Sequence, residues 1–296
     1  MPLRPALELI NRAQAGGYAV GYFESWNLES LQGVIDAAEE TRSPLLIGFN
    51  GEFMSHAGRR TAERLNWYAA LGQAAAASAN VPCGLIFNEC ADDAWIRAAI
   101  DSGFSQVMPD DPDAAPATFQ QRVAELTRYA HSKGVAVEAE VGHLATGAAG
   151  VLGDGVQVVT DPDEAADFVR ATGIDLMAVS VGNVHILLDG QKPLDLDSLA
   201  AIRAKVKVPF DLHGGSGIPA ASLREAIRLG VAKVCYGTYV KQRYLTALRT
   251  GLATAEKNPH RLLGFGGPED LLVAGRLAVK NAVLERIHDL GCCGKA

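Results

Sequence analysis

A histidine followed by a glycine-rich turn is the segment whose residue types most directly offer chemistry. His213 precedes the run Gly214-Gly215-Ser216-Gly217, and Pro219 follows shortly after. An imidazole can bind a metal ion, and the backbone N–H groups of a glycine turn at the start of a helix can bind a phosphate. The alternative is a tight turn between a strand and a helix, which needs glycine for positive φ and carries an incidental histidine.

Polar side chains stand at or just beyond the ends of most of the apolar segments that we expect to form strands. They are Glu24, Asn50, Asn88, Glu89, Asp110, Glu138, Glu140, Asn183, His185, His213 and Thr238. The ends of strands are solvated, so some polar residues are expected there in any case. Two histidines among several carboxylates are harder to explain as surface decoration, and we predict a functional site at these strand ends.

Two of these histidines are the best candidates for a metal site. His185 and His213 are expected at the ends of the sixth and seventh strands, and neighbouring strands lie about 4.8 Å apart, so the two imidazoles can share one ion. Glu89 is our candidate for a third ligand, which gives two histidines and one carboxylate with room for a substrate. The alternative for each histidine is a buried structural side chain.

Glu138 and Glu140 are two residues apart, so both side chains project from the same face of the fifth expected strand. If that face is the inner one, the two carboxylates could support a metal-binding histidine or hold another cation. The alternative is a salt bridge inside the fold, for example with Lys233. The sequence leaves these two interpretations open.

A second turn matches the one after His213. Gly237 and Thr238 end the eighth expected strand, and in eight-stranded barrels the loops after strands seven and eight frequently form a phosphate site. We therefore predict that Gly237 and Thr238 bind a phosphate together with Gly214, Gly215 and Ser216.

The elements that position these residues alternate regularly along the chain. We expect strands at residues 19–24, 45–50, 83–89, 106–110, 135–141, 176–182, 208–213 and 233–238, and helices at 28–40, 57–79, 91–102, 117–133, 163–172, 197–206, 220–229, 240–256 and 268–290. Eight strands, each followed by a helix, are typical of a closed (β/α)₈ barrel of the α/β class. A doubly wound open sheet is the alternative, although it rarely needs eight regular units.

Composition narrows the class of protein. No linker or change of composition divides the 296 residues, so we expect one barrel domain over 1–296, with 268–296 as a C-terminal helical extension. The net charge of −7 argues against a nucleic acid or membrane surface as partner. We see no signal peptide and no apolar run of about 18 residues. The five cysteines are scattered and form no CxxC pair. A reduced cytoplasmic protein is expected.

Over nearly its whole length the sequence resembles the class II, metal-dependent ketose-bisphosphate aldolases of the fructose- and tagatose-bisphosphate type. The run from 212 to 219 together with His185 is the most specific feature, and the remaining similar segments are 27–29, 43–47, 137–142, 160–166 and the glycine-bracketed tail 291–296. The resemblance implies a cytoplasmic lyase of carbohydrate metabolism that acts on a sugar phosphate. It also implies a homodimer or homotetramer, with the C-terminal helix as a plausible contact.

The resemblance carries a mechanism and roles for particular residues. These enzymes use zinc, bound by three histidines, to polarise the ketose carbonyl and to stabilise the enediolate formed on C–C cleavage. His185 and His213 take two of the ligand positions. Gly182, Gly214, Ser216 and Thr238 correspond to the region that binds the donor phosphate and a monovalent cation. The phosphate then anchors the reacting carbons.

The sequence departs from the family pattern at the centre of the chemistry. Where the family carries His-Leu-Asp-His after the third strand, this chain reads Ile86-Phe87-Asn88-Glu89. An amide at position 88 cannot exchange a proton usefully, and a carboxylate at 89 replaces a histidine ligand. On the eighth strand, the family carries an asparagine that contacts substrate where this chain has Cys235. On the second strand, the family carries a segment with glutamine where this chain has Gly48-Phe49-Asn50.

Three explanations follow from these departures. Our first prediction is an aldolase of altered substrate specificity, in which Asn88 and Glu89 belong to the catalytic site. Glu89 would then bind the metal, and protons would pass through Asp92, Asp93 or a water held by Asn88. The second is another metal-dependent barrel enzyme, such as an isomerase or epimerase. The third is a degenerate protein that binds a sugar phosphate without turning it over.

The segment after the fifth strand is rich in glycine and alanine from residue 144 to 158, which suits a loop that closes over a site. By resemblance, an acidic residue on this loop abstracts the substrate proton. Asp154 is the acid that this segment offers, and we predict that role for it. The alternative is a turn aspartate before Gly155.

Overall fold

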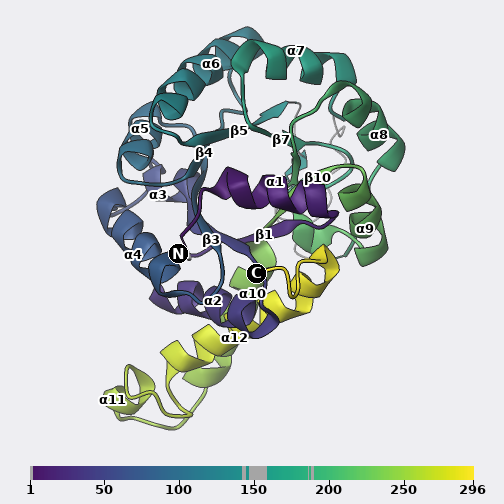
Figure 1. Ribbon diagram of the computed structural model, residues 1–296. Coiled ribbons are helices and arrows are strands. Elements are labelled where there is room, and N and C mark those ends of the chain that lie inside the picture. The colour runs from purple at the N-terminus through teal and green to yellow at the C-terminus, as the bar shows by residue number, and fades with distance from the viewer. Residues whose placement is uncertain (1–2, 142–144, 147–158, 186, 188–189) are drawn as a thin grey trace.

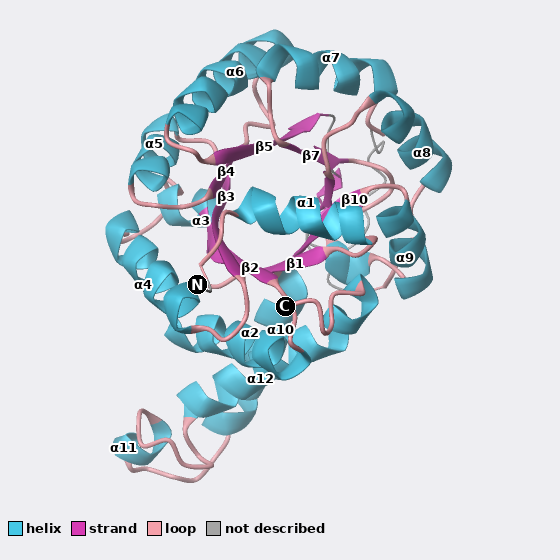
Figure 2. Cartoon of the chain, in the orientation of Figure 1, coloured by secondary structure: helices cyan, strands magenta, loops and turns pink. Residues whose placement is uncertain are grey.

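Eight parallel strands close into a barrel in the computed structural model, which describes residues 3–141, 145–146, 159–185, 187 and 190–296. Around the barrel the order is β1-β10-β9-β7-β5-β4-β3-β2, and the strands form the inner ring in Figure 2. The predicted (β/α)₈ fold is therefore confirmed. The strands are β1 (Val20–Phe23), β2 (Leu45–Asn50), β3 (Cys83–Cys90), β4 (Gln106–Pro109), β5 (Ala136–Val141), β7 (Leu176–Val179), β9 (Phe210–Leu212) and β10 (Val231–Tyr236).

Helices form the outer ring and bury the outward face of the strands (Figure 1). They are α2 (Leu28–Thr41), α4 (Leu65–Ser78), α5 (Asp93–Asp101), α6 (Pro116–Ser132), α7 (Pro162–Thr172), α8 (Leu196–Lys205), α9 (Ala220–Arg228), α10 (Thr238–Leu252) and α12 (Leu271–Ile287). The strands read as continuous apolar runs because both of their faces are covered. Among the described residues, no helix combines the length and apolar character needed to cross a membrane.

Local sequence signals explain where several helices begin and end. Asn27 and Ser30 form a reciprocal capping box at the start of α2. Asp161 caps α7 with Pro162 in its first turn, and Gly173 ends the same helix in the left-handed conformation. These caps set the lengths of the helices, and the lengths determine where each strand returns to the barrel.

A helix that the sequence analysis did not predict closes the opposite end of the barrel. α1 (Ala6–Gly16) contacts β1, β3 and β10 and lies across the barrel in Figure 1. The Arg4 N–H donates to the carbonyl of Cys83, the first residue of β3, at 2.8 Å, so α1 covers the amino ends of the strands. Pro5 precedes it and no side chain caps its first turn, which explains why the usual start signals are missing.

Several predicted boundaries were wrong. The helix expected at 57–79 begins only at Leu65, and a short helix, α3 (Gly51–Ser55), precedes it. The intervening loop is held by Arg59, whose guanidinium donates to the Phe53 carbonyl at 2.8 Å and pairs with Glu63. The expected helix at 268–290 starts at Leu271, ends at Ile287 and continues as a 3₁₀ turn (His288–Leu290), and α11 (Pro259–Leu262) was not predicted.

α12 is fastened to the barrel through α2. A Cβ added to Gly33 of α2 would lie 2.5 Å from the Arg276 carbonyl oxygen, so the two helices approach as closely as glycine allows. Arg276 also binds Asp36 through two nitrogens, at 2.6 and 2.7 Å. The C-terminal helix is therefore packed as part of the outer ring, while the segment around α11 projects away from it (Figure 1).

The close approach of β2 and β3 provides a test of the barrel. A Cβ on Gly48 would lie 1.9 Å from the Ile86 carbonyl oxygen, so Gly48→Ala must push two paired strands apart. We expect it to lower the free energy of unfolding by about 2–3 kcal/mol, measured by urea denaturation. Gly267→Ala is the control, because its added Cβ meets the nearest atom at 3.5 Å. Equal stability of the two variants would contradict this account of the packing.

Candidate active site

A cavity of about 250 Å³, which we call the central cavity, lies at the carboxyl ends of the strands. Asn50 ends β2, Glu89 stands at the end of β3, and His213 directly follows β9. The cavity therefore gathers most of the residues predicted from the sequence. Its lining includes Asn50, Asn88, Glu89, His185, His213, Gly214, Ser216, Cys235, Gly237 and Thr238.

Three of these side chains converge on one point. Glu89 Oε1 lies 2.7 Å from His213 Nδ1 and 3.5 Å from His185 Nε2. One ligand atom from each of the three lies within 4.8 Å of the other two, and the two imidazole rings meet edge to face. Two imidazole nitrogens and a carboxylate oxygen at this spacing suit a divalent cation such as zinc.

The backbone of Glu89 is unusual, and this aims its side chain. Its φ is +48°, in the left-handed region that residues other than glycine rarely adopt, and the register of β3 against β4 shifts between Phe87 and Cys90. Such a shift redirects side chains at the rim of a barrel. The carboxylate is then held by Asn50, whose Nδ2 donates to Oε2 at 2.5 Å. The left-handed backbone costs about 1–2 kcal/mol, so the surrounding fold must enforce it.

The Nε2 side of the His213 ring, away from Glu89, contacts two buried carboxylates. Its Nε2 lies 3.0 Å from Asp211 Oδ2 and 3.2 Å from Glu138 Oε1. Asn183 Nδ2 donates to the His213 carbonyl oxygen at 3.1 Å. An N–H at Nε2 that donates to these carboxylates leaves Nδ1 directed at Glu89 and the cavity, which is the arrangement typical of metal-binding histidines.

The two glutamates of β5 have different surroundings. Glu138 is fully buried and contacts Lys233 Nζ at 2.6 Å, Gln106 Nε2 at 2.5 Å and His213. Both interpretations of Glu138 from the sequence therefore describe real contacts: it supports a candidate ligand and also forms an internal salt bridge. Glu140 is only half-buried.

Lys233 is the cation of a fully buried cluster beneath the cavity. Its ammonium also lies 3.1 Å from Asp211 Oδ2 and 3.5 Å from Asn88 Oδ1. Burial lowers the pKa of Lys233, but Asp211 and the other acidic neighbours outweigh this effect and raise it well above the ordinary value. The lysine is therefore charged and fixes the carboxylates that hold His213.

Neighbouring charges also shift the pKa values of the residues around the cavity. Burial raises the pKa of Glu89, but the imidazoles of His185 and His213 overcome this and lower it to about 2. Burial lowers the pKa of His213, whereas Cys235, Glu89 and Asp211 raise it well above the usual value. Because burial also raises the pKa of the Cys235 thiol, that thiol is neutral, and the carboxylates are the source of the effect on His213. Carboxylates that hold a proton on His213 would equally attract a metal ion.

A second set of candidate ligands fits a cation less well. Asp211, His213 and Cys235 also lie within 4.8 Å of one another. The Lys233 ammonium already contacts Asp211 there, and the Cys235 thiol donates to the same Asp211 oxygen at 3.1 Å. A metal ion would meet a charged ammonium at this point, so Glu89, His185 and His213 form the better site.

The glycine turn after His213 packs against its neighbours on two sides. Gly214 has φ +68°, and an added Cβ would lie 2.1 Å from the Val184 carbonyl oxygen. An added Cβ on Gly215 would lie 2.6 Å from Val234 and 3.0 Å from the Cys235 carbonyl oxygen. Gly214 therefore has the positive φ that the structural interpretation of the turn proposed, and close packing requires glycine at both positions. Gly214 and Ser216 nonetheless line the cavity, together with Thr238 at the first turn of α10.

Some predicted site residues lie elsewhere than expected, and some do not line the cavity; His185 lines it but comes from an unexpected element. His185 is not at the end of a barrel strand, because β7 ends at Val179; it lies in a two-residue strand, β8 (Val184–His185), which pairs with β6 (Ala145–Thr146). Gly182 forms a turn against residues 193–195, with φ +101°, and neither Gly182 nor Gly215 is among the lining residues that the structure describes. Asp154 lies outside the described residues.

The two aspartates considered for proton transfer have structural partners. Asp92 caps α5 by accepting from the N–H groups of Ala94 and Trp95, at 2.7 and 3.1 Å. Asp93 forms an ion pair with Arg122 at 2.6 Å. In the described part of the chain neither lines the central cavity, so the structure gives no support to Asp92 or Asp93 as proton carriers.

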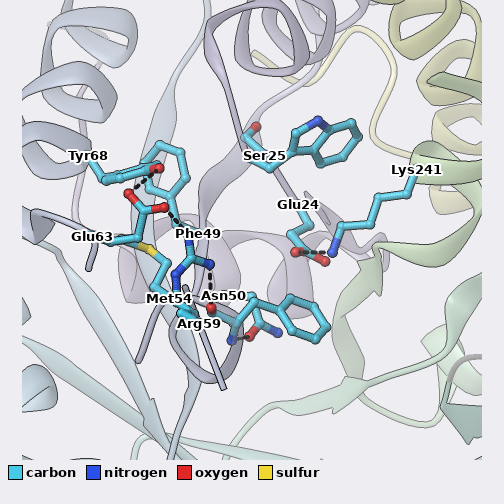
Figure 3. A pocket seen from close by; sticks show the side chains of 11 residues that line it. Glu24, Ser25, Phe49, Asn50, Met54, Arg59, Glu63, Tyr68 and Lys241 are labelled. Atoms are coloured by element: carbon cyan, nitrogen blue, oxygen red, sulfur yellow. Dashed lines mark hydrogen bonds and ion pairs between the residues drawn. The ribbon is translucent and has the colours of Figure 1, made fainter. Parts of the chain in front are cut away.

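A second cavity of about 290 Å³, which we call the outer chamber, adjoins the first (Figure 3). The two share Glu24, Asn50, Phe53 and Lys241. The rest of the chamber is lined by Ser25, Trp26, Phe49, Met54, Arg59, Glu63 and Tyr68. Glu24 was recognised as a strand-end residue, but no sequence pattern indicated Lys241, Arg59 or Glu63, which belong to segments expected to be helical.

Two further carboxyl groups near the cavities hold their protons more tightly than usual. Burial raises the pKa of Glu24, although Lys241, whose Nζ lies 2.5 Å from Oε1, partly opposes this. Burial and the charge of Glu89 raise the pKa of Asp110, which follows β4, to about 6. Of the two, Glu24 lines the central cavity. The buried Tyr22 hydroxyl lines it as well and has no hydrogen-bond partner among the described residues.

Comparisons with known proteins identify the family of the chain and agree with its fold. The family model described as "Fructose-bisphosphate aldolase class-II" matches residues 4–295. A fructose-bisphosphate aldolase of Geobacillus stearothermophilus is 33% identical over 300 residues, covering 100% of this chain and 99% of that protein. The crystal structure of the YdjI aldolase from Escherichia coli K12 superposes with a TM-score of 0.82, at 30% identity over 99% of both chains. A fructose-bisphosphate aldolase from Campylobacter jejuni, at 23% identity and a TM-score of 0.78 over 99% of this chain and 97% of that one, shares the fold.

The buried Lys233 cluster predicts a large effect of one substitution. Lys233→Met leaves Glu138 and Asp211 without their cation in the barrel interior. We expect a loss of about 3–5 kcal/mol in the free energy of unfolding, measured by urea denaturation. Arg97→Met is the control, because it removes an exposed ion pair with Glu125 and should cost less than about 1 kcal/mol. Similar losses in the two variants would refute the role given to Lys233.

Proposed function

Because this chain belongs to the class II fructose-bisphosphate aldolase family and is therefore an aldolase-type lyase, we propose that it makes and breaks a C–C bond of a ketose phosphate. A divalent metal bound beside the substrate would balance the negative charge that develops when this bond is broken. The observation that carries the proposal is the meeting of Glu89, His185 and His213 in a cavity that the glycine turn also lines. The substrate specificity is altered relative to the family pattern.

The metal site consists of Glu89, His185 and His213, and zinc is the metal we propose. When bound, such an ion supplies Lewis acidity at the ketose carbonyl. The protein holds its side chains ready: Asn50 orients Glu89, while Asp211 and Glu138 orient His213. A donor set fixed from behind in this way needs little rearrangement to bind a cation.

The donor phosphate is held by the two turns that line the central cavity. Gly214, Ser216, Gly237 and Thr238 all lie there, and Thr238 opens a 15-residue helix whose N-terminal N–H groups favour an anion. Phosphate binding at this end fixes the position of the reacting carbons. A monovalent cation beside this turn, with Gly182 contributing, stays a prediction from the resemblance.

Proton handling must differ from the family pattern, because the amide of Asn88 cannot exchange a proton usefully. Its Oδ1 faces Lys233 at 3.5 Å, which fits a positioning role for Asn88. Glu24 is our candidate for the group that carries the proton, since it lines the central cavity and burial raises its pKa. Asp154 stays our candidate for abstraction of the donor proton.

We also propose that the protein is cytoplasmic and forms a homodimer or homotetramer. The projecting segment around α11 supports the second point, because Leu252, Leu263 and Phe265 are 64%, 55% and 73% exposed there. Apolar side chains gathered on an arm outside the barrel suit burial against another copy.

A retro-aldol assay tests the proposed function. The purified protein is incubated with several ketose mono- and bisphosphates, and the released triose phosphate is measured by a coupled enzymatic assay. We expect metal-dependent cleavage that EDTA abolishes and that inorganic phosphate inhibits competitively. Isomerised or epimerised ketose without cleavage would favour another class of barrel enzyme, and binding without any turnover would favour a degenerate protein.

Substitution of Glu89 tests the metal site directly. Glu89→Gln replaces a charged oxygen ligand by a neutral amide, so we expect bound metal, measured by inductively coupled plasma mass spectrometry after dialysis, to fall at least about tenfold. Glu125→Gln, an exposed carboxylate of a surface ion pair, is the matched control and should keep its metal. Unchanged metal in the Glu89 variant would remove Glu89 from the ligand set.

A further inference from the structure

The outer chamber is positioned to hold the part of a substrate that extends beyond the central cavity. Asn50 stands between the two spaces: its Nδ2 donates to Glu89 Oε2 at 2.5 Å, and its Oδ1 accepts from the N–H of Phe53 at 3.1 Å. Asn50, Glu24, Phe53 and Lys241 line both cavities. A ligand anchored by its phosphate at the glycine turns can therefore pass Glu89 and continue into the chamber.

The positive charges that line the chamber are already matched by carboxylates. Arg59 pairs with Glu63 and also donates to the Phe53 carbonyl at 2.8 Å. Tyr68 donates to the second oxygen of Glu63 at 3.0 Å. Figure 3 shows Arg59, Glu63 and Tyr68 linked side by side on one wall. A phosphate placed here would meet a guanidinium that is neutralised by its own partner.

The opposite wall repeats this arrangement. Lys241 Nζ lies 2.5 Å from Glu24 Oε1 and 4.2 Å from the centre of the Phe53 ring. Aromatic rings complete the lining, from Trp26, Phe49, Phe53 and Tyr68. Paired charges offer hydrogen-bond donors and acceptors without net charge, and aromatic faces pack against C–H groups. Alternating hydroxyl and C–H groups of a sugar chain match both.

We propose that the outer chamber binds the aldehyde half of the substrate as an uncharged polyhydroxylated chain, and that it disfavours an aldehyde with a terminal phosphate. This inference rests on the proposed aldolase function and specifies its substrate class: a ketose phosphorylated at the donor end alone. The chamber volume of about 290 Å³ stands at the lower end of ligand pockets and suits a small aldose. The Arg59–Glu63 pair and the Lys241–Glu24 pair set the preference.

The experiment runs the reaction in the direction of synthesis. Dihydroxyacetone phosphate is the donor, and aldehydes are supplied in pairs with and without a terminal phosphate: D-glyceraldehyde against its 3-phosphate, and D-erythrose against its 4-phosphate. We expect kcat/KM to be at least about tenfold higher for the neutral member of each pair, because a phosphate would lose hydration among pairs that offer it no net positive charge. A preference for the phosphorylated member of either pair would overturn the inference.

One substitution tests the origin of the preference. Glu63→Gln leaves the Arg59 guanidinium without its carboxylate, so we expect the phosphorylated aldehydes to gain about tenfold in relative kcat/KM, mainly through a lower KM. Glu125→Gln removes the carboxylate from the surface pair with Arg97 and should leave the ratio unchanged. If the Glu63 variant keeps the wild-type ratio, the ion pair is not the cause and the inference fails.

A measurement without any aldehyde separates failure of this inference from failure of the proposed function. Wild-type protein is incubated with dihydroxyacetone phosphate in D₂O, and proton exchange at the donor carbon is followed by NMR. Exchange together with a preference for phosphorylated aldehydes would refute the chamber assignment and leave the aldolase function intact. Absence of exchange would refute the aldolase function, and the inference with it.

Discussion

The Lys233 ammonium, buried at the base of the site, fixes the side chains above it through ion pairs. It lies against Glu138 and Asp211, and these carboxylates hold the Nε2 side of His213. Neither carboxylate could stay charged in the barrel interior without a cation nearby. The orientation of a candidate ligand thus depends on a charge beneath it, and the barrel supplies that charge from β10, which pairs with β9.

The carboxylate at position 89 changes the electrostatics of the cavity above. Two neutral imidazoles and a carboxylate make a ligand set one unit more negative than three imidazoles. A bound dication would then attract anions less strongly, and an anionic substrate would depend more on the backbone of the two turns. The fold holds the Glu89 carboxylate in place through its left-handed backbone, the register shift of β3 and the Asn50 contact. Such support argues that Glu89 is part of a built site.

The sequence predicted the barrel and most of the cavity lining because both follow local rules. Apolar runs, caps and glycine turns determine the strands, and strand ends in a parallel barrel must meet. It did not predict α1, whose start lacks a capping side chain, or the loop before α4, which depends on the contacts of Arg59. The outer chamber depends on that loop and on Lys241, a helix residue that meets Glu24, just after β1, only in the folded chain. Such contacts between distant segments leave no periodic pattern in a sequence.

Charge pairing is the rule that links the two cavities. Under the site, Lys233 is matched by two carboxylates; in the outer chamber, Arg59 and Lys241 are each matched by one. The difference lies in what remains exposed to a ligand. The central cavity presents a carboxylate and two imidazoles that share one focus, an arrangement that attracts a cation. The chamber presents neutralised ion pairs and aromatic faces, which attract neither cations nor anions strongly. Specificity at the chamber end would therefore come from shape and hydroxyl contacts, which discriminate by hydrogen bonds made or lost.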